Sequence, residues 1–272
     1  YWGMPMGGTR SVTQKTVTRV FLAIVLVIIA GLGGGGWYLS NVLRDGALVV
    51  DRGPLERDLE VVDIGEGEVT LHVIPQTEED GPWTRDGIWG LEWDDGYAQV
   101  GTIYNISNQQ VSRKFIPIAG IPRIGERVSI DSYAFPGDPQ KAFGIPFENV
   151  SYSSPLGNFS AWLVDGSFDT WVIFVHGRGS GSPPEALRML PTVAESGFPS
   201  LIITYRDDPG MPASSRRLYG YGQTEWEDLE GAAMYAVERG AEDLVLVGYS
   251  MGGAIVMNFL YESPLAEKVR GA

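Results

Sequence analysis

The stretch "LVLVGYSMGGAIV" (residues 244–256) places a serine between small residues, after an apolar run and before a helix-like run. The apolar run predicts a buried strand, and the run that follows it predicts a helix. On a tight strand-to-helix turn, Gly248 and Gly252 leave room for the neighbouring backbone, and the hydroxyl of Ser250 is raised above the sheet. The pattern, with Gly253 after it, is typical of a nucleophile elbow.

The sequence around this stretch predicts the sheet that carries the turn. Two further apolar strands are expected in "TWVIFVHGRGSGS" (170–182) and "PSLIITYRDDPG" (199–210). Helices are expected at 184–197, where Pro191 interrupts the pattern, and at 224–240, with a Thr224–Glu227 capping box and a stop at Gly240. Strands that are apolar on both faces and alternate with helices predict a mostly parallel sheet flanked by helices, an α/β fold.

The region before this sheet has a different pattern. Residues 148–166 predict a hairpin, and residues 46–145 read as short strands around turns such as "GEGE" and "DDG". His72 lies in this β-rich region, where a lone strand histidine is more often structural than catalytic. We interpret residues 46–145 as a β-rich accessory region without visible chemistry.

The N-terminal region contains a charge-free run, "VFLAIVLVIIAGLGGGGWYL" (20–39). Twenty helical residues span about 30 Å, the thickness of the hydrocarbon core of a bilayer. A cleaved signal peptide is the alternative, but glycines and Trp37 stand where a cleavage site is expected. The basic residues before the run place segment 1–19 in the cytoplasm and the rest of the chain outside it.

Composition excludes several classes of function. The formal net charge of −14 argues against a nucleic-acid partner. The chain has no cysteine and two histidines, so neither a thiolate site nor a histidine-rich metal site is expected. We expect no cofactor and no metal.

Residues 146–272 resemble the α/β-hydrolase superfamily, most closely its serine aminopeptidase and monoglyceride-lipase-like branch. The resemblance is carried by "VHGRG" (175–179), "EWEDLEGA" (225–232) and "GYSMGG" (248–253). It implies that Ser250 is the nucleophile and that the backbone N–H groups of Met251 and Arg178 form the oxyanion hole. His176 and Gly177 would then shape the oxyanion loop, His176 without acting as the base.

The same resemblance places the catalytic acid and then the base after the nucleophile. Residues 251–272 contain Glu262 and Glu267, but no aspartate and no histidine. Asp207 and Asp208 precede Ser250 and do not match the triad acid. We therefore interpret the chain as C-terminally truncated, an incomplete α/β-hydrolase domain at 146–272. In this interpretation the strand at 244–248 lacks its next neighbour, so its outer edge is expected to be exposed.

The expected function is a membrane-anchored serine hydrolase that cleaves an ester or amide bond in a small-molecule or lipid-like substrate through a Ser250 acyl-enzyme. Two alternatives stay open. One is an acyltransferase on the same fold, which passes the acyl group to an acceptor other than water. The other is a non-catalytic binding module that keeps the α/β-hydrolase fold.

Overall fold

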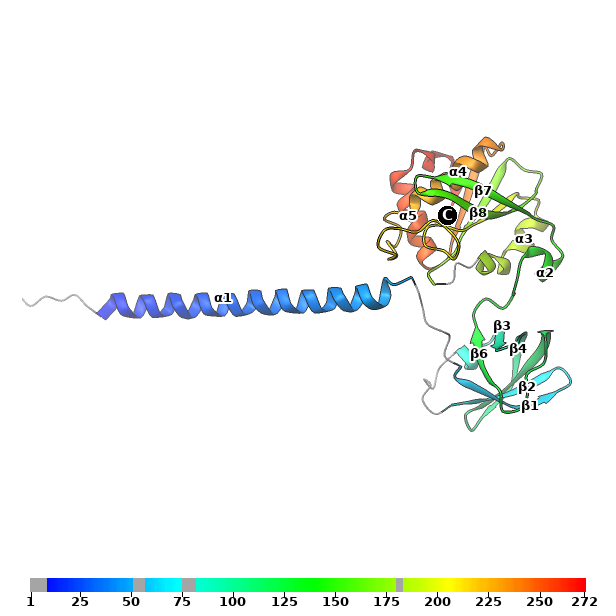
Figure 1. The fold of residues 1–272 in the computed structure, drawn as a ribbon, viewed down its shortest axis with the longest axis horizontal. Coiled ribbons are helices and arrows are strands. Elements are labelled where there is room, and N and C mark those ends of the chain that lie inside the picture. Colours follow the sequence, from blue (N-terminus) through cyan, green and yellow to red (C-terminus); the bar gives the residue numbers. More distant parts are fainter. Residues whose placement is uncertain (1–8, 51–56, 75–81, 180–182) are drawn as a thin grey trace, which may run out of the picture. The chain divides into compact units, whose positions relative to one another are not determined.

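The computed structural model describes residues 9–50, 57–74, 82–179 and 183–272 (Figure 1). The expected cytoplasmic segment 1–19 therefore lies partly outside the described residues. The chain divides into two compact units, Tyr1–Val49 and Val50–Ala272.

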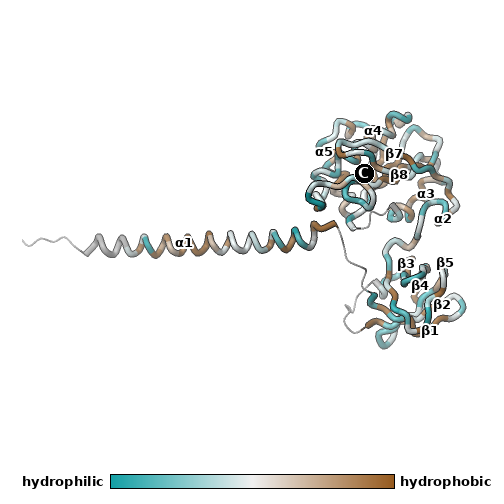
Figure 2. Tube along the Cα trace, viewed as in Figure 1, coloured by the Kyte–Doolittle hydropathy of each residue, from teal (hydrophilic) through white to brown (hydrophobic). Residues whose placement is uncertain are grey.

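The first unit consists of one long helix. Helix α1 spans Thr9–Val42 and continues into a wider turn at Leu43–Ala47. Hydrophobic residues follow one another along its middle (Figure 2). The stretch Thr16–Gly46 is long and apolar enough to cross a membrane, a property that an N-terminal signal sequence shares. The expected span at 20–39 lies inside this helix.

Six strands of the second unit close into a barrel. They are β1 (Leu59–Gly65), β2 (Glu68–Val73), β3 (Trp89–Trp93), β4 (Gly96–Ser107), β5 (Gln110–Ala119) and β6 (Arg127–Asp131). Their order around the barrel is β1-β2-β5-β4-β3-β6, and β1 pairs with β6 to close it. The two expected turns are confirmed, since Gly65 pairs with Glu68 and Trp93 with Gly96.

The barrel interior contains one fully buried cation. Arg113 on β5 has no exposed surface, and its guanidinium donates to the carbonyls of Trp83, Arg85, Gly87 and Gly101 at 2.9–3.2 Å. A buried charge is tolerated only when its hydrogen bonds are satisfied. Arg113 therefore ties the segment before β3 and a residue of β4 to β5.

The second group of strands forms an open sheet. It contains β7 (Glu148–Ser154), β8 (Gly157–Val164), β9 (Thr170–Val175), β10 (Ser200–Ile203), β11 (Asp243–Gly248) and β12 (Val269–Gly271). The order is β12-β11-β9-β10-β8-β7. Strands β12, β11, β9 and β10 are parallel, whereas β7 and β8 form the expected hairpin and run antiparallel. The predicted mostly parallel sheet is confirmed.

Helices cover both faces of this sheet. Helices α4 (Trp226–Glu238) and α5 (Met251–Glu262) pack on the face that carries Ile173 of β9. A 3₁₀ turn at Pro183–Arg188 and helix α3 (Leu190–Glu195) pack on the face that carries Phe174. Pro191 in the first turn of α3 confirms the expected interruption.

Two sequence-based expectations are wrong in detail. The Thr224–Glu227 capping box does not form, because the carboxylate of Glu227 accepts from Arg206 at 2.8 Å instead. The outer edge of β11 was expected to be exposed, but β12 pairs with it in parallel at Leu244 and Val245. The stop at Gly240 is confirmed by its φ of 103°.

Candidate active site

Ser250 has the backbone conformation that a nucleophile elbow requires. It stands between β11 and α5 with φ 50° and ψ −112°, a combination that residues other than glycine rarely adopt. Strain of this kind persists only where the surrounding structure fixes it, and it gathers at functional sites. The turn leaves the side chain of Ser250 exposed at the start of α5.

Two of the three expected glycines are sterically required. A Cβ atom at Gly252 would lie 2.1 Å from the carbonyl oxygen of Val175, and one at Gly248 would lie 2.6 Å from the backbone of Gly252 and Gly253. At Gly253 the nearest atom would be 3.7 Å away, an ordinary contact. The turn therefore depends on Gly248 and Gly252, whereas Gly253 has no steric role.

Sheet topology places Ser250 where open α/β sheets bind ligands. The chain leaves β9 for β10 on one side and later returns to β11 on the other, so β9 and β11 form a topological switch point. Gly177 follows β9, and a Cβ atom there would lie 3.1 Å from Cβ of Ser250. The glycine-rich loop after β9 and the serine after β11 therefore meet at the carboxyl ends of these two strands.

His176 is buried and both of its ring nitrogens are engaged. Its Nδ1 lies 2.8 Å from the carbonyl oxygen of Gly177, and its Nε2 lies 2.8 Å from Oδ2 of Asp208. A carbonyl oxygen only accepts, so Nδ1 carries a proton, and a carboxylate favours a proton on Nε2 as well. Both ring nitrogens are therefore committed to Gly177 and Asp208, and neither is directed to Ser250 as a base.

The carbonyl of Gly177 is held from a second side. The hydroxyl of Tyr205 lies 3.0 Å from this oxygen and 3.1 Å from that of His176, and the Tyr205 ring stacks on the imidazole at 4.2 Å. In a trans peptide the C=O and the following N–H point in opposite directions. Fixing the Gly177 carbonyl therefore also fixes the direction of the Arg178 N–H.

Two carboxylates hold the neighbouring loops and were not identified from the sequence. Glu185 accepts from the N–H of Gly177 at 2.6 Å. Glu225, which is 1% exposed, accepts from the N–H groups of Gly220 and Gly222 at 2.6 and 3.0 Å. The loop that Glu225 organises brings the hydroxyl of Tyr221 to the side chain of Arg178 at 3.0 Å.

Asp208 gives this site a pH-dependent stability. Burial lowers the pKa of His176, but the charge of Asp208 and its hydrogen bond outweigh burial, so the pKa of His176 lies above its ordinary value. The stabilisation from a raised pKa is complete below the unfolded-state value, about 6.5, and is lost as the pH rises through the folded-state value.

We therefore expect Asp208→Asn to destabilise the sheet by about 1–3 kcal/mol, more at about pH 6 than at about pH 8.5. Without the carboxylate, the two largest causes that raise the pKa of His176 are lost, so its pKa falls and the variant loses most stability relative to the parent at low pH. Thermal unfolding of the variant and the parent at both pH values measures the difference in their stability. Asp207→Asn is the matched control. The neighbouring Asp207 accepts from the Ser214 N–H at 2.9 Å, whereas His176 bonds to Asp208, so this change leaves the His176 pair intact. An equal loss of stability at both pH values would show that Asp208 does not raise the pKa of His176.

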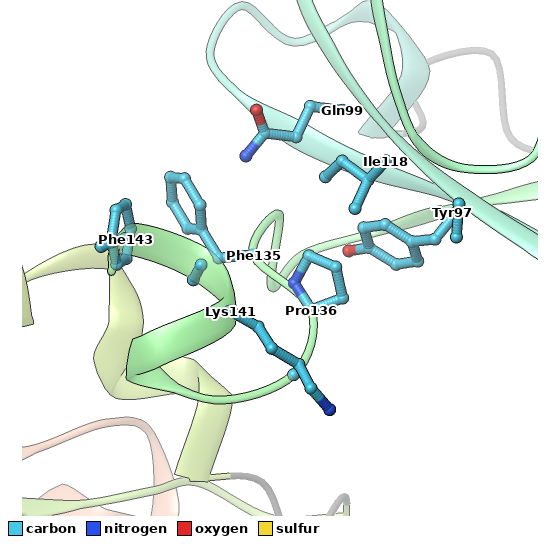
Figure 3. A pocket seen from close by; sticks show the side chains of 10 residues that line it. Tyr97, Gln99, Ile118, Phe135, Pro136, Lys141 and Phe143 are labelled. Atoms are coloured by element: carbon cyan, nitrogen blue, oxygen red, sulfur yellow. The ribbon is translucent and has the colours of Figure 1, made fainter. Parts of the chain in front are cut away.

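A separate cavity of about 510 Å³ has no lining residue in the elbow or the His-Gly loop. Phe135 and Phe143 line one side of it, and Tyr97 and Ile118 of the barrel line the other (Figure 3). The hydroxyl of Tyr97 donates to Asp131 at 2.6 Å. This cavity therefore plays no part in the site around Ser250.

No family model and no curated protein matches the chain. Solved structures are similar to it. An esterase from Pyrococcus furiosus is 18% identical with a TM-score of 0.42 over 50% of this chain and 54% of its own. A serine hydrolase without a lid from Xanthomonas campestris is 19% identical, with a TM-score of 0.36 over 44% of this chain and 57% of its own. An esterase from Exiguobacterium antarcticum is 20% identical, with a TM-score of 0.35 over 43% of this chain and 41% of its own. The chain spans about half the length of these proteins.

Proposed function

We propose that this protein is a membrane-anchored serine hydrolase of the α/β-hydrolase type that cleaves an ester or amide bond through an acyl-enzyme on Ser250. The observation that carries the proposal is the positive φ of Ser250 at the carboxyl end of β11, directly against Gly177. A strained, exposed serine at a topological switch point is what nucleophilic attack on a bound carbonyl needs.

The oxyanion hole of this proposal uses two backbone donors. Met251 begins α5, so its N–H belongs to the first turn, which has no acceptor within the helix. Arg178 supplies the second N–H, aimed by the bonds of His176 and Tyr205 to the carbonyl before it. Each donor is worth about 3–4 kcal/mol of transition-state stabilisation. The bonds to the Gly177 carbonyl hold the Arg178 N–H in this direction before substrate binds.

The proposal needs a general base that neither histidine of residues 1–272 supplies. His72 lies on barrel strand β2, and His176 is committed to Gly177 and Asp208. This requirement is also what favours the second candidate, a non-catalytic binding module that keeps the elbow. The two differ in one property, because only the enzyme needs Ser250 to be nucleophilic.

The anchor of this proposal is α1. The charge-free run at 20–39 and the basic residues before it support a single span with the catalytic part outside the cytoplasm. An anchored enzyme of this kind suits small-molecule or lipid-like esters and amides that reach it from the outer side.

One labelling experiment tests both the nucleophile and the orientation. A fluorophosphonate with a charged, membrane-impermeant tag is applied to intact spheroplasts that produce the protein from its complete reading frame. We expect one adduct, on the Ser250 hydroxyl by peptide mass spectrometry, because only an activated serine reacts. Ser250→Ala is the control and should carry no adduct.

Each other outcome has a definite meaning. Labelling that appears only after the membrane is broken would refute the placement of the catalytic part outside the cytoplasm, but it would still support Ser250 as the nucleophile. No labelling in either case, from a protein that folds, would refute the enzyme and favour the binding module.

A further inference from the structure

The barrel carries four isoleucines with exposed side chains in the segment "IPIAGIPRI" (116–124). Ile116 and Ile118 lie on β5 and are 44% and 48% exposed, and Ile121 and Ile124 follow in the next loop and are 64% and 68% exposed. We call these four side chains the isoleucine surface. Single exposed apolar residues are ordinary, whereas a cluster of large ones marks an interaction site.

The backbone of this segment is held in place. The N–H of Gly125 donates to the carbonyl of Val61 at 2.7 Å, and the N–H of Val61 donates to Glu126 at 3.0 Å. The N–H of Arg123 donates to the Glu126 carboxylate at 2.7 Å, and Pro122 is buried between the two exposed isoleucines of the loop. The loop is therefore bonded to β1, and Ile121 and Ile124 are presented outward by a defined turn.

The apolar character continues beyond the four side chains. Ile118 also lines the cavity of about 510 Å³, where it lies opposite Phe135 and Phe143 (Figure 3). Ile118 thus belongs both to the isoleucine surface and to the lining of this cavity.

The segment itself is basic in an acidic chain, with Glu68 on β2 opposite Lys114 and the Glu126 carboxylate on the N–H of Arg123 as the neighbouring acids. Residues 110–125 contain Arg113, Lys114 and Arg123 and no acid, in a chain with a net charge of −14. Arg113 is buried, whereas Lys114 and Arg123 are exposed on either side of the first isoleucines. Large apolar side chains flanked by cations fit the boundary between the headgroups and acyl chains of an anionic bilayer.

The chain also limits how far the barrel can be from a membrane that contains α1. The helical region ends at Ala47 and β1 begins at Leu59, so the connection reaches at most about 43 Å. An anchored barrel would therefore stay within reach of the lipid headgroups.

We propose that the isoleucine surface docks on the anionic bilayer in which α1 is anchored. This inference rests on the anchor of the proposed function, but not on the serine chemistry. Docking would hold the barrel against the membrane and limit the movement of the chain that follows it.

The absence of cysteine in the chain allows a direct test. The full chain is reconstituted in vesicles containing phosphatidylglycerol, with Ile121→Cys carrying an environment-sensitive fluorophore. Glu66→Cys, in the exposed β1–β2 turn, is the matched control. We expect the label at 121 to show a blue-shifted, severalfold brighter emission that is quenched by lipids with a nitroxide on the acyl chain, and the label at 66 to behave as in water.

Second-site changes test the chemistry of the surface. Adding Ile124→Ser, or Lys114→Gln with Arg123→Gln, should return most of the emission at 121 to the level of the control. Vesicles of phosphatidylcholine alone should give a weaker signal than anionic vesicles. Both isoleucine positions are exposed, so these variants should still fold.

Three results would overturn the proposal. One is water-like emission at 121 from protein that floats with the vesicles, which keeps the anchor and refutes the docking. Another is a blue shift that grows with the ratio of protein to lipid and is insensitive to nitroxide lipid, which would assign the surface to a second copy of the chain. The third is protein that does not float with the vesicles, which would refute the anchor itself and the docking with it.

Discussion

Gly252→Ala is expected to destabilise the sheet that carries Ser250 by about 1–3 kcal/mol, at the upper end of this range because the clash is with backbone. The added methyl carbon would lie 2.1 Å from the carbonyl oxygen of Val175 and 2.7 Å from that of His176. Both oxygens belong to backbone that cannot rotate away, at the end of the strand between β10 and β11. Helix α5 would have to move away from β9, and the Ser250 turn would move with it.

Gly253→Ala provides the matched control. Its methyl carbon would lie 3.7 Å from the nearest atom, and alanine favours a helix over glycine by about 1 kcal/mol, so the variant should be as stable as the parent or more stable. Hydrogen exchange in peptides from β9 and β11 reports on this sheet separately from the barrel. Equal protection in the two variants would show that the close approach of α5 to β9 is not rigid.

Asp228→Ala is expected to cost about 3–5 kcal/mol, the usual result of removing one partner of a buried ion pair. Asp228 has no exposed surface and accepts from Nε of Arg206 at 2.7 Å, from its Nη2 at 3.0 Å and from its backbone N–H at 3.0 Å. It also bonds to the hydroxyl of Ser154. Its loss leaves the guanidinium buried with Glu227 as its remaining carboxylate partner, and it removes the bond from α4 to Ser154 at the end of β7.

Glu227→Ala is the control for this variant. Glu227 contacts the same guanidinium at 2.8 Å, but its side chain is 37% exposed. Exposed pairs contribute about 0–1 kcal/mol, so the thermal midpoint of this variant should stay close to that of the parent. Similar losses in the two variants would mean that burial does not determine the value of the Arg206 interactions.

The parts of the fold that the sequence predicted depend on local patterns. The elbow, the hairpin at 148–166 and the strands around β9 and β10 each combine a hydrophobic period with a turn signal within a few residues. These patterns also place Ser250 and Gly177 at the same edge of the sheet, since parallel strands share the direction of their carboxyl ends.

The misses involve contacts between residues distant in sequence. Thr224 and Glu227 have the spacing of a capping box, but Arg206 from the end of β10 takes the Glu227 carboxylate. His176 and Asp208 are 32 positions apart, and nothing in either segment indicates their hydrogen bond. Barrel closure has the same origin, because the pairing of β1 with β6 joins the two ends of the region.

That last pairing makes the barrel a detachable module. The chain enters the barrel at Leu59, which pairs with Val128. It leaves the barrel at Asp131, three residues after Val128. Paired strands lie about 4.8 Å apart, so the entry and exit points are close neighbours in space. A short loop could bridge them if the whole barrel were excised, and another domain with adjacent termini could be grafted in its place. The closeness of these two points makes excision of the barrel geometrically feasible, with the two bonds from Arg188 to the carbonyls of Ile88 and Ser132 as contacts that would be lost.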